Sequence, residues 1–221
     1  MANVSTEEVA SITDVVKRLV DVLGAVIGLV VLAPVLAVLA LLVRLRLGSP
    51  IFFRQRRPGL DGRPFTILKF RTMTEERDEP GRLLPASDRL TDFGRTLRST
   101  SLDELPELVN VLRGDMSLVG PRPLRLEYLD HYSPRQARRH EVRPGITGVA
   151  QISGRNTLAW SDRLELDVWY VDNRSLRLDL LVLLQTLWIT LRREGVHSAE
   201  GGIIEPFEGT GPGSEPGGRG D

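Results

Sequence analysis

One apolar stretch, residues 19–43, constrains the fold of this chain more than any other feature. It reads LVDVLGAVIGLVVLAPVLAVLALLV, and Asp21 is its only ionisable residue. About 20 apolar residues suffice to cross a bilayer as a helix, and a stretch that is apolar on every side is not typical of a surface helix in a soluble domain. A cleaved signal peptide fits poorly, because acidic residues precede the stretch and it exceeds the usual apolar core of such peptides. We therefore expect a membrane-inserted helix here.

Two topologies are compatible with this helix. Pro34 lies in the middle of the stretch, where it removes one backbone hydrogen bond and bends the helix. Lys17 and Arg18 precede the stretch, Arg44 and Arg46 follow it, and basic residues favour the cytoplasmic side of a membrane. A re-entrant helix, which leaves the membrane on the side where it entered, satisfies both pairs. A single-pass anchor also remains open, because proline is tolerated in spanning helices.

The composition excludes several kinds of function. The chain of 221 residues is long enough for one domain with a hydrophobic core. It has no cysteine, which excludes disulfides, thiol catalysis and cysteine-bound zinc, and its three histidines are too scattered to predict a histidine-rich metal site. The 29 basic and 29 acidic residues balance, and no aromatic residues alternate with the arginines. Nucleic acid is therefore not an expected partner.

The remaining pattern predicts a mostly α-helical fold with a small β-hairpin, an α+β class. β-prone residues at 51–54 and 65–70 flank a turn-rich segment that contains Pro58-Gly59 and Asp61-Gly62, which predicts the hairpin. Loops are expected at 78–90 and 113–124, and a strand or extended loop at 143–156. Helices are expected at 102–112, 124–132, 134–141 and 161–173, the last with Ser161 as its N-cap.

A leucine-rich helix is expected at residues 175–195. Arg177, Asp179 and Gln185 make this segment too polar to span a membrane, so we expect an amphipathic helix in the membrane interface or a helix of the protein core. The segment 201–221 is rich in glycine and proline, a composition typical of a disordered tail.

A basic band follows the apolar stretch. Nine basic and three acidic residues lie between Arg44 and Arg77, which suits either anionic lipid headgroups or a phosphorylated substrate. Lys69 differs from the other bases because its neighbours in ILKFRTM are apolar. A lysine in this setting extends its stem along apolar surface or serves a functional site.

Asp103 and Glu104 form an acidic pair in STSLDELPEL, residues 99–108. One interpretation is structural, since Ser101 and Glu104 match a capping box at the start of a helix. The other is catalytic. Adjacent helical residues point in different directions, which suits one carboxylate that attacks phosphorus and a second that binds Mg²⁺. Four bases are candidates for neutralising phosphoryl oxygens, namely Lys69, Arg98, Arg122 and Arg155.

Four long motifs resemble those of the bacterial sugar transferase family, the monotopic phosphoglycosyl transferases, in its minimal form. They are KRLVDVLGA, FRQRRPGLDGRPFTILKFRTM, RSTSLDELPELVNVLRGDMSLVGPRPL and VRPGITGVAQISGRN. The resemblance extends from about Lys17 to Gly195. It implies that a sugar-1-phosphate moves from a UDP-sugar to a polyprenol phosphate, usually undecaprenyl phosphate, with release of UMP, as the first step of membrane glycoconjugate assembly.

The resemblance also assigns roles to individual residues. It implies that Asp103 is a nucleophile that forms a covalent aspartyl-phosphosugar, and that Glu104 binds the Mg²⁺ cofactor. It further implies that four bases line the phosphate and nucleotide site, namely Lys69, Arg98, Arg122 and Arg155.

In topology, the resemblance implies a monotopic protein on the cytoplasmic face of the bacterial inner membrane, in contact with membrane lipid. The family's re-entrant helix is broken at a Ser-Pro pair, where this chain has Ala33-Pro34. The proline is kept, but the serine hydroxyl that would bond the freed backbone group is missing. The expected organisation is an N-terminal segment at 1–16, a re-entrant helix at 17–47 broken near Pro34, a catalytic domain at 48–196 with an interfacial helix at about 176–193, and a mostly disordered tail at 197–221.

Two other functions remain compatible with the residues alone. One is a non-enzymatic, membrane-anchored scaffold whose acids cap a helix. The other is a single-pass phosphohydrolase that uses water as its acceptor. No residue pattern distinguishes among UDP-sugars, glycan pathways or oligomeric states.

Overall fold

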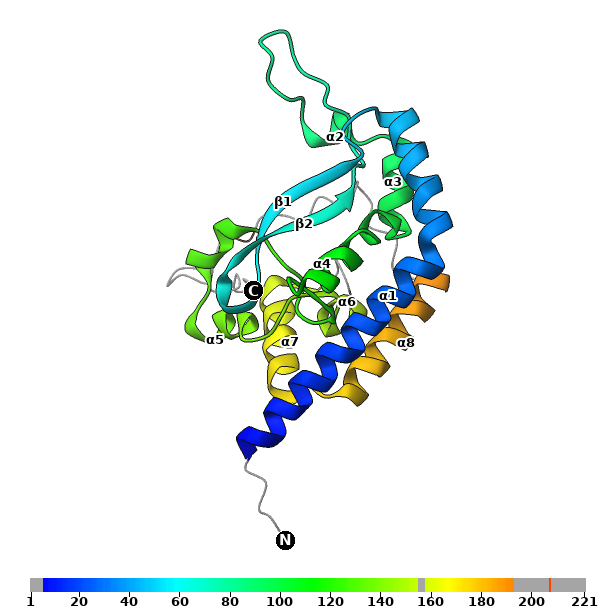
Figure 1. The fold of residues 1–221 in the computed structure, drawn as a ribbon. Coiled ribbons are helices and arrows are strands. Elements are labelled where there is room, and N and C mark those ends of the chain that lie inside the picture. Colours follow the sequence, from blue (N-terminus) through cyan, green and yellow to red (C-terminus); the bar gives the residue numbers. More distant parts are fainter. Residues whose placement is uncertain (1–5, 155–157, 193–206, 208–221) are drawn as a thin grey trace.

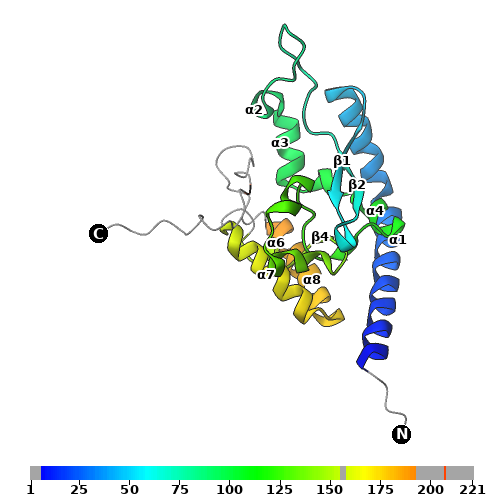
Figure 2. The ribbon, with the colours of Figure 1, turned by 90° about the vertical axis from the view of Figure 1, so that its left-hand side faces the viewer.

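The computed structural model describes residues 6–154, 158–192 and 207. Its longest element is helix α1 (Thr6–Leu47), which begins within the segment expected to precede the membrane helix and stays helical through Pro34. The axis of α1 changes direction along its length in both views of the fold (Figures 1 and 2). Helicity through Pro34 does not test the predicted re-entrant topology, which stays a prediction.

The hairpin expected after α1 is confirmed. Strands β1 (Phe52–Pro58) and β2 (Pro64–Phe70) pair antiparallel, with Phe52 opposite Phe70. The connection contains one turn of 3₁₀ helix, η1 (Leu60–Gly62). Asp61 and Gly62 both have positive φ, a backbone conformation that aspartate and glycine tolerate better than most residues.

Short helices (Figure 1) and a second small sheet follow the hairpin. Its strands β3 (Ser117–Val119) and β4 (Gly145–Thr147, labelled in Figure 2) pair in parallel, although the sequence predicted a loop and an ambiguous extended segment there. The other elements are α2 (Ala86–Arg89), α3 (Asp92–Ser99), η2 (Leu102–Glu104), α4 (Glu107–Arg113), η3 (Leu126–His131), α5 (Pro134–Ala137), η4 (Arg138–His140), α6 (Val149–Ile152), α7 (Trp160–Asn173) and α8 (Leu176–Arg192).

Two expected helix starts are corrected by the structure. The single helix expected at 102–112 is divided into η2 and α4, and Pro106 is the N-cap of α4. Proline lacks an N–H and so suits the start of a helix rather than its interior. Helix α7 begins at Trp160 with Ala159 at its N-cap, so Ser161 lies inside the helix and is not the cap.

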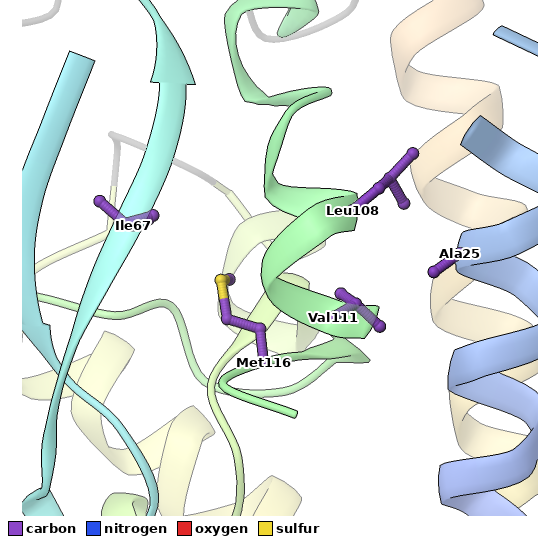
Figure 3. Close-up of a cluster of buried hydrophobic side chains, with 5 residues drawn as sticks. All are labelled: Ala25, Ile67, Leu108, Val111 and Met116. Atoms are coloured by element: carbon purple, nitrogen blue, oxygen red, sulfur yellow. The ribbon is translucent and has the colours of Figure 1, made fainter. Parts of the chain in front are cut away.

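The core brings α1, α4 and β2 together. Figure 3 shows α4 between β2 and α1, where Ala25, Ile67, Leu108, Val111 and Met116 form one buried cluster. Towards its C-terminal end α1 contributes to a second buried cluster, composed of Leu39, Val43, Phe70 and Leu97. The globular part of the chain therefore packs against α1 along much of its length.

The single acid of the apolar stretch has a structural role. Asp21 is 4% exposed, and its Oδ1 accepts a hydrogen bond from the N–H of Leu118 at 3.0 Å. Lys17, one turn earlier, forms an ion pair with Asp179 of α8 at 2.6 Å. These contacts fix the N-terminal half of α1 to β3 and α8.

Large apolar side chains remain exposed on α1 and α8. Residues 13–47 are long and apolar enough to cross a membrane by length and composition. On α8, Leu180, Leu184, Leu187 and Trp188 are each more than half exposed. They recur at the three- and four-residue spacing of one helix face, as the interfacial interpretation of this segment requires.

Candidate active site

The acidic pair lies on η2, directly after an abrupt turn of the backbone. Ser101 adopts the left-handed conformation (φ 56°, ψ 17°), and its side chain makes no capping hydrogen bond. The predicted capping box is therefore wrong. The side chain of Glu104 instead turns towards basic residues of β2 and of the loop after β3.

Strand β2 supplies the first of these bases. Lys69 lies two residues after the buried Ile67, so both side chains are on the face of the hairpin that packs against α4. The Lys69 ammonium lies 2.6 Å from Glu104 Oε1 and 3.0 Å from Glu107 Oε1. Lys69 therefore lies at the acidic pair, and its assignment to a functional site stays a prediction.

Arg122 binds the same carboxylate from the other side. Its Nη2 donates to Glu104 Oε1 at 2.5 Å, and its Nη1 lies 3.4 Å from Glu104 Oε2. This forked arrangement of guanidinium and carboxylate is among the stronger protein ion pairs. The side chain of Arg122 is 44% exposed, so part of the guanidinium remains accessible to a ligand.

Arg98 reaches the site from helix α3. Its Nε donates to Thr72 Oγ1 at 3.0 Å, and its positive charge favours the ionised form of Asp103. The structure thus brings Lys69, Arg98 and Arg122 to the acidic pair, as predicted. Arg155 lies outside the described residues, so its assignment stays a prediction.

Asp103 and Glu104 have opposite electrostatic environments. Asp103 is 7% exposed, and burial together with the charge of Glu104 raises its pKa to about 6, against the pull of the three bases. Burial alone would also raise the pKa of Glu104, but Arg122 and Lys69 hold that pKa well below its ordinary value. No described residue donates a hydrogen bond to the carboxylate of Asp103 (Glu104, in contrast, has two basic partners).

A third carboxylate, Glu107, was missed by the sequence analysis. It is 2% exposed, and burial followed by the charge of Glu104 raises its pKa to about 7 although Lys69 is close. Its position three residues after Glu104 was a usable signal, because this spacing returns to the same face of a helix. Asn110, also missed, fixes β2 to α4 by accepting from Leu68 N–H and donating to Thr66 O.

The described residues contain no group of three or more His, Cys, Asp or Glu side chains arranged around a metal ion. Mg²⁺, however, is commonly bound by one or two carboxylates together with the phosphates of a substrate. Glu104 is ionised and adjoins the exposed edge of Arg122. A single carboxylate of this kind fits a metal that arrives with a diphosphate.

The geometry is suited to nucleophilic substitution at phosphorus. Among the described residues, it combines a buried carboxylate that receives no hydrogen bond, a neighbouring carboxylate that stays ionised, and bases that can bind phosphoryl oxygens. Cationic groups placed where negative charge develops stabilise such a transition state.

Comparisons with known proteins agree with this chemistry. The family model described as bacterial sugar transferase matches residues 12–193. The uncharacterized sugar transferase EpsL of Bacillus subtilis is 53% identical over 197 residues, which cover 89% of this chain and 98% of that protein. A UDP-glucose:undecaprenyl-phosphate glucose-1-phosphate transferase of Caulobacter vibrioides is 44% identical, over 79% of this chain and 69% of that protein. The exopolysaccharide production protein ExoY of Rhizobium meliloti is 38% identical, over 82% of this chain and 88% of that protein.

Proposed function

Because the chain belongs to the bacterial sugar transferase family, we propose that it transfers a sugar-1-phosphate from a UDP-sugar to undecaprenyl phosphate and releases UMP. The names of the relatives from Caulobacter vibrioides and Klebsiella pneumoniae support these two substrate classes. The observation that carries the proposal is Asp103, a buried carboxylate that no described residue hydrogen-bonds, beside the clamped and ionised Glu104.

In the first half-reaction an oxygen of Asp103 attacks the β-phosphorus of the UDP-sugar. The bond between that phosphorus and the bridging oxygen of the diphosphate breaks, and UMP leaves with the electron pair. An aspartyl-phosphosugar remains on the enzyme. A carboxylate with a pKa of about 6 is ionised at neutral pH, so this step needs no general base.

The three bases have separate tasks in this step. Arg122, partly exposed beside Glu104, binds the incoming diphosphate with the part of its fork that faces solvent. Lys69 lies between Glu104 and Glu107, and its positive charge keeps Glu104 ionised. Arg98, half-buried against Thr72, favours the ionised form of Asp103.

Glu104 is the carboxylate that would hold Mg²⁺ in this site. When bound, Mg²⁺ offsets the negative charge of the diphosphate. The roles of the protein residues are unchanged: an oxygen of Asp103 attacks phosphorus, and Arg122 binds the phosphate.

In the second half-reaction an oxygen of undecaprenyl phosphate attacks the phosphorus of the aspartyl-phosphosugar. The bond from phosphorus to Asp103 breaks, which regenerates the carboxylate and yields an undecaprenyl diphosphate sugar. The lipid approaches from the bilayer, and we place the exposed apolar residues of α1 and α8 in the cytoplasmic leaflet of the inner membrane.

The contacts of α1 with the domain favour a re-entrant or interfacial arrangement of this helix over a single membrane span. Near its N-terminal end, Arg18 donates to the carbonyl oxygens of Val111 and Leu112 in α4. At its C-terminal end, Arg71 donates to the carbonyl oxygens of Leu47 and Ser49. Because one globular domain binds the helix at both places, we propose that both ends of α1 lie on the same side of the membrane.

The test is UMP release from a panel of UDP-sugars, measured with and without undecaprenyl phosphate, together with intact-mass analysis of the enzyme. We expect at least one UDP-sugar to give a covalent phosphosugar adduct on the wild type and none on Asp103→Asn. Asp92→Asn on α3 is the matched control, because that side chain is 96% exposed.

Three outcomes contradict parts of the proposal. An adduct that still forms on Asp103→Asn removes Asp103 as the nucleophile. Free sugar-1-phosphate produced at full rate without the lipid identifies a phosphohydrolase. No turnover of any UDP-sugar by a folded wild type supports the scaffold interpretation.

A further inference from the structure

The loop that carries Arg122 has few hydrogen-bond donors of its own. Pro121 and Pro123 flank the arginine and lack backbone N–H groups. On one side, Gly145 N–H of β4 donates to the carbonyl oxygen of Pro121 at 3.0 Å. The position of the Arg122 backbone therefore depends strongly on what binds its own carbonyl oxygen.

That carbonyl oxygen accepts a hydrogen bond from a buried arginine. Arg139 of η4 donates from Nη2 to Arg122 O at 2.7 Å. Its Nε and Nη2 also donate to Asp167 Oδ2 of α7 at 3.0 and 2.7 Å, and its Nη1 donates to Tyr132 Oη at 3.2 Å. The side chains of Arg139 and Asp167 are only 1% and 7% exposed.

A buried ion pair of this kind is weak evidence for stability. Removing two charges from water costs about as much as their attraction returns, and well-packed apolar residues of similar size often replace such a pair without loss. What an apolar pair cannot supply is the donor to Arg122 O. The Arg139–Asp167 pair connects the long helix α7 to the backbone of the residue that clamps Glu104.

We propose that Arg139, held in place by Asp167, is a positioning residue for the transfer reaction. It fixes the backbone of Arg122 so that the Arg122 guanidinium faces both Glu104 and the diphosphate of the substrate. The inference rests on the proposed function, because it takes Arg122 to be a phosphate-binding residue. Arg139 itself touches no reacting atom, and its effect is geometric, since displacement of a binding group by about 1 Å costs on the order of 100-fold in rate.

The main test uses the double variant Arg139→Met, Asp167→Leu, which removes both charges and keeps the volume. We expect its thermal midpoint to match the wild type, because neither charge is left unpaired. We expect kcat/KM for UMP release to fall about 10- to 100-fold. The loss should appear as a raised KM for the UDP-sugar, because Arg122 is the residue proposed to bind the diphosphate, whereas a purely structural role would lower kcat alone.

A second variant and a control complete the design. Arg139→Lys keeps a positive charge opposite Asp167 but loses the guanidinium fork, and we expect the same rise in KM for the UDP-sugar. Arg138→Lys, at the neighbouring arginine that pairs with Glu141 and Asp172 on the surface, should stay within about two-fold of the wild type.

The outcomes separate this inference from the proposed function. A wild type that releases no UMP contradicts the proposed function. An active wild type beside a folded double variant with unchanged kcat/KM, or with an unchanged KM for the UDP-sugar, overturns the positioning role alone. Loss of the fold in both the double variant and Arg139→Lys also overturns it, since the pair would then serve stability.

Discussion

At the scale of single residues, two adjacent carboxylates differ in their contacts, because the basic side chains bind mainly one of them. Glu104 binds both Lys69 and Arg122, whereas Asp103 is buried without a hydrogen-bond donor from any described residue. The two pKa values therefore move in opposite directions. Neighbouring acids with divergent pKa values are a common sign of different chemical roles.

The first prediction concerns the energetic cost of Asp103. Burial and the charge of Glu104 raise the pKa of Asp103 from its ordinary value of 3.8 to about 6 in the folded protein. A raised carboxyl pKa destabilises the folded state, by an amount that is absent below the unfolded pKa and complete above the folded one. At pH 7.5 the free energy of unfolding of Asp103→Asn should therefore exceed that of the wild type by on the order of 1–3 kcal/mol. The variant should unfold at a higher temperature and lose activity.

Thermal unfolding in detergent at two pH values checks the sign of this difference in stability between Asp103→Asn and the wild type. The advantage of Asp103→Asn should shrink between about pH 6 and about pH 4. Asp92→Asn, on the surface of α3, is the control for an aspartate-to-asparagine change at an exposed site. If Asp103→Asn is less stable than the wild type at pH 7.5, the ionised carboxylate of Asp103 does not destabilise the folded protein, and the prediction is wrong.

The second prediction is the pH dependence of the first half-reaction. UMP release should rise with pH as Asp103 loses its proton, with an acid limb near pH 6. Arg98→Gln should move this limb to higher pH, because the charge of Arg98 lowers the pKa of Asp103. A limb near pH 4, the range of an ordinary aspartate, contradicts the raised pKa of Asp103.

Residue-level patterns predicted the members of the site better than their contacts. Lys69, Asp103, Glu104, Arg98 and Arg122 were all named from the sequence, and the structure brings them together. The capping box failed because it assumes an extended cap residue, whereas Ser101 is left-handed. Glu107 and Arg139 were missed, because their roles depend on contacts with residues distant in sequence.

At the scale of elements, helix α1 lies close to the domain at two glycines. A Cβ at Gly24 would lie 2.7 Å from Leu118 Cδ1, and a Cβ at Gly28 would lie 3.2 Å from Leu108 Cδ1. The two glycines are four residues apart, so they lie on one face of α1. This face packs on β3 and α4.

The third prediction tests that packing. Gly24→Leu should push α1 away from β3 and destabilise the protein by about 1–3 kcal/mol, as overpacked interiors do. Thermal unfolding in detergent measures the effect. Val26→Leu is the control, because Val26 is 43% exposed on α1. Equal midpoints for the two variants contradict close packing of α1 at Gly24.

Elements with local signals were predicted well, and those with distant partners were not. The hairpin follows from its turn residues and from two β-prone runs, and it was found where expected. Strands β3 and β4 have three residues each, and Ser117 pairs with Gly145, so no local pattern marks them. The helix at 102–112 was divided because Pro106 starts a new helix.

At the scale of the whole molecule, the length of α1 matters for its topology. Its 42 residues correspond to about 60 Å, roughly twice the hydrocarbon thickness of a bilayer. The domain contacts α1 at Lys17 and Arg18 near one end and at Leu47 near the other. A perpendicular span would draw this polar domain into the bilayer, where buried charges are costly.

The fourth prediction therefore concerns sidedness. The chain has no cysteine, so a single Ala2→Cys reports the position of the N-terminal segment with a membrane-impermeant thiol reagent. A separate Arg82→Cys reports the catalytic domain, because the Arg82 side chain is 79% exposed. If both ends of α1 lie on the cytoplasmic side, neither cysteine is labelled in intact spheroplasts and both are labelled in inside-out vesicles. Labelling of Ala2→Cys alone in spheroplasts would show a spanning helix and contradict the re-entrant topology, while leaving the chemistry of Asp103 untouched.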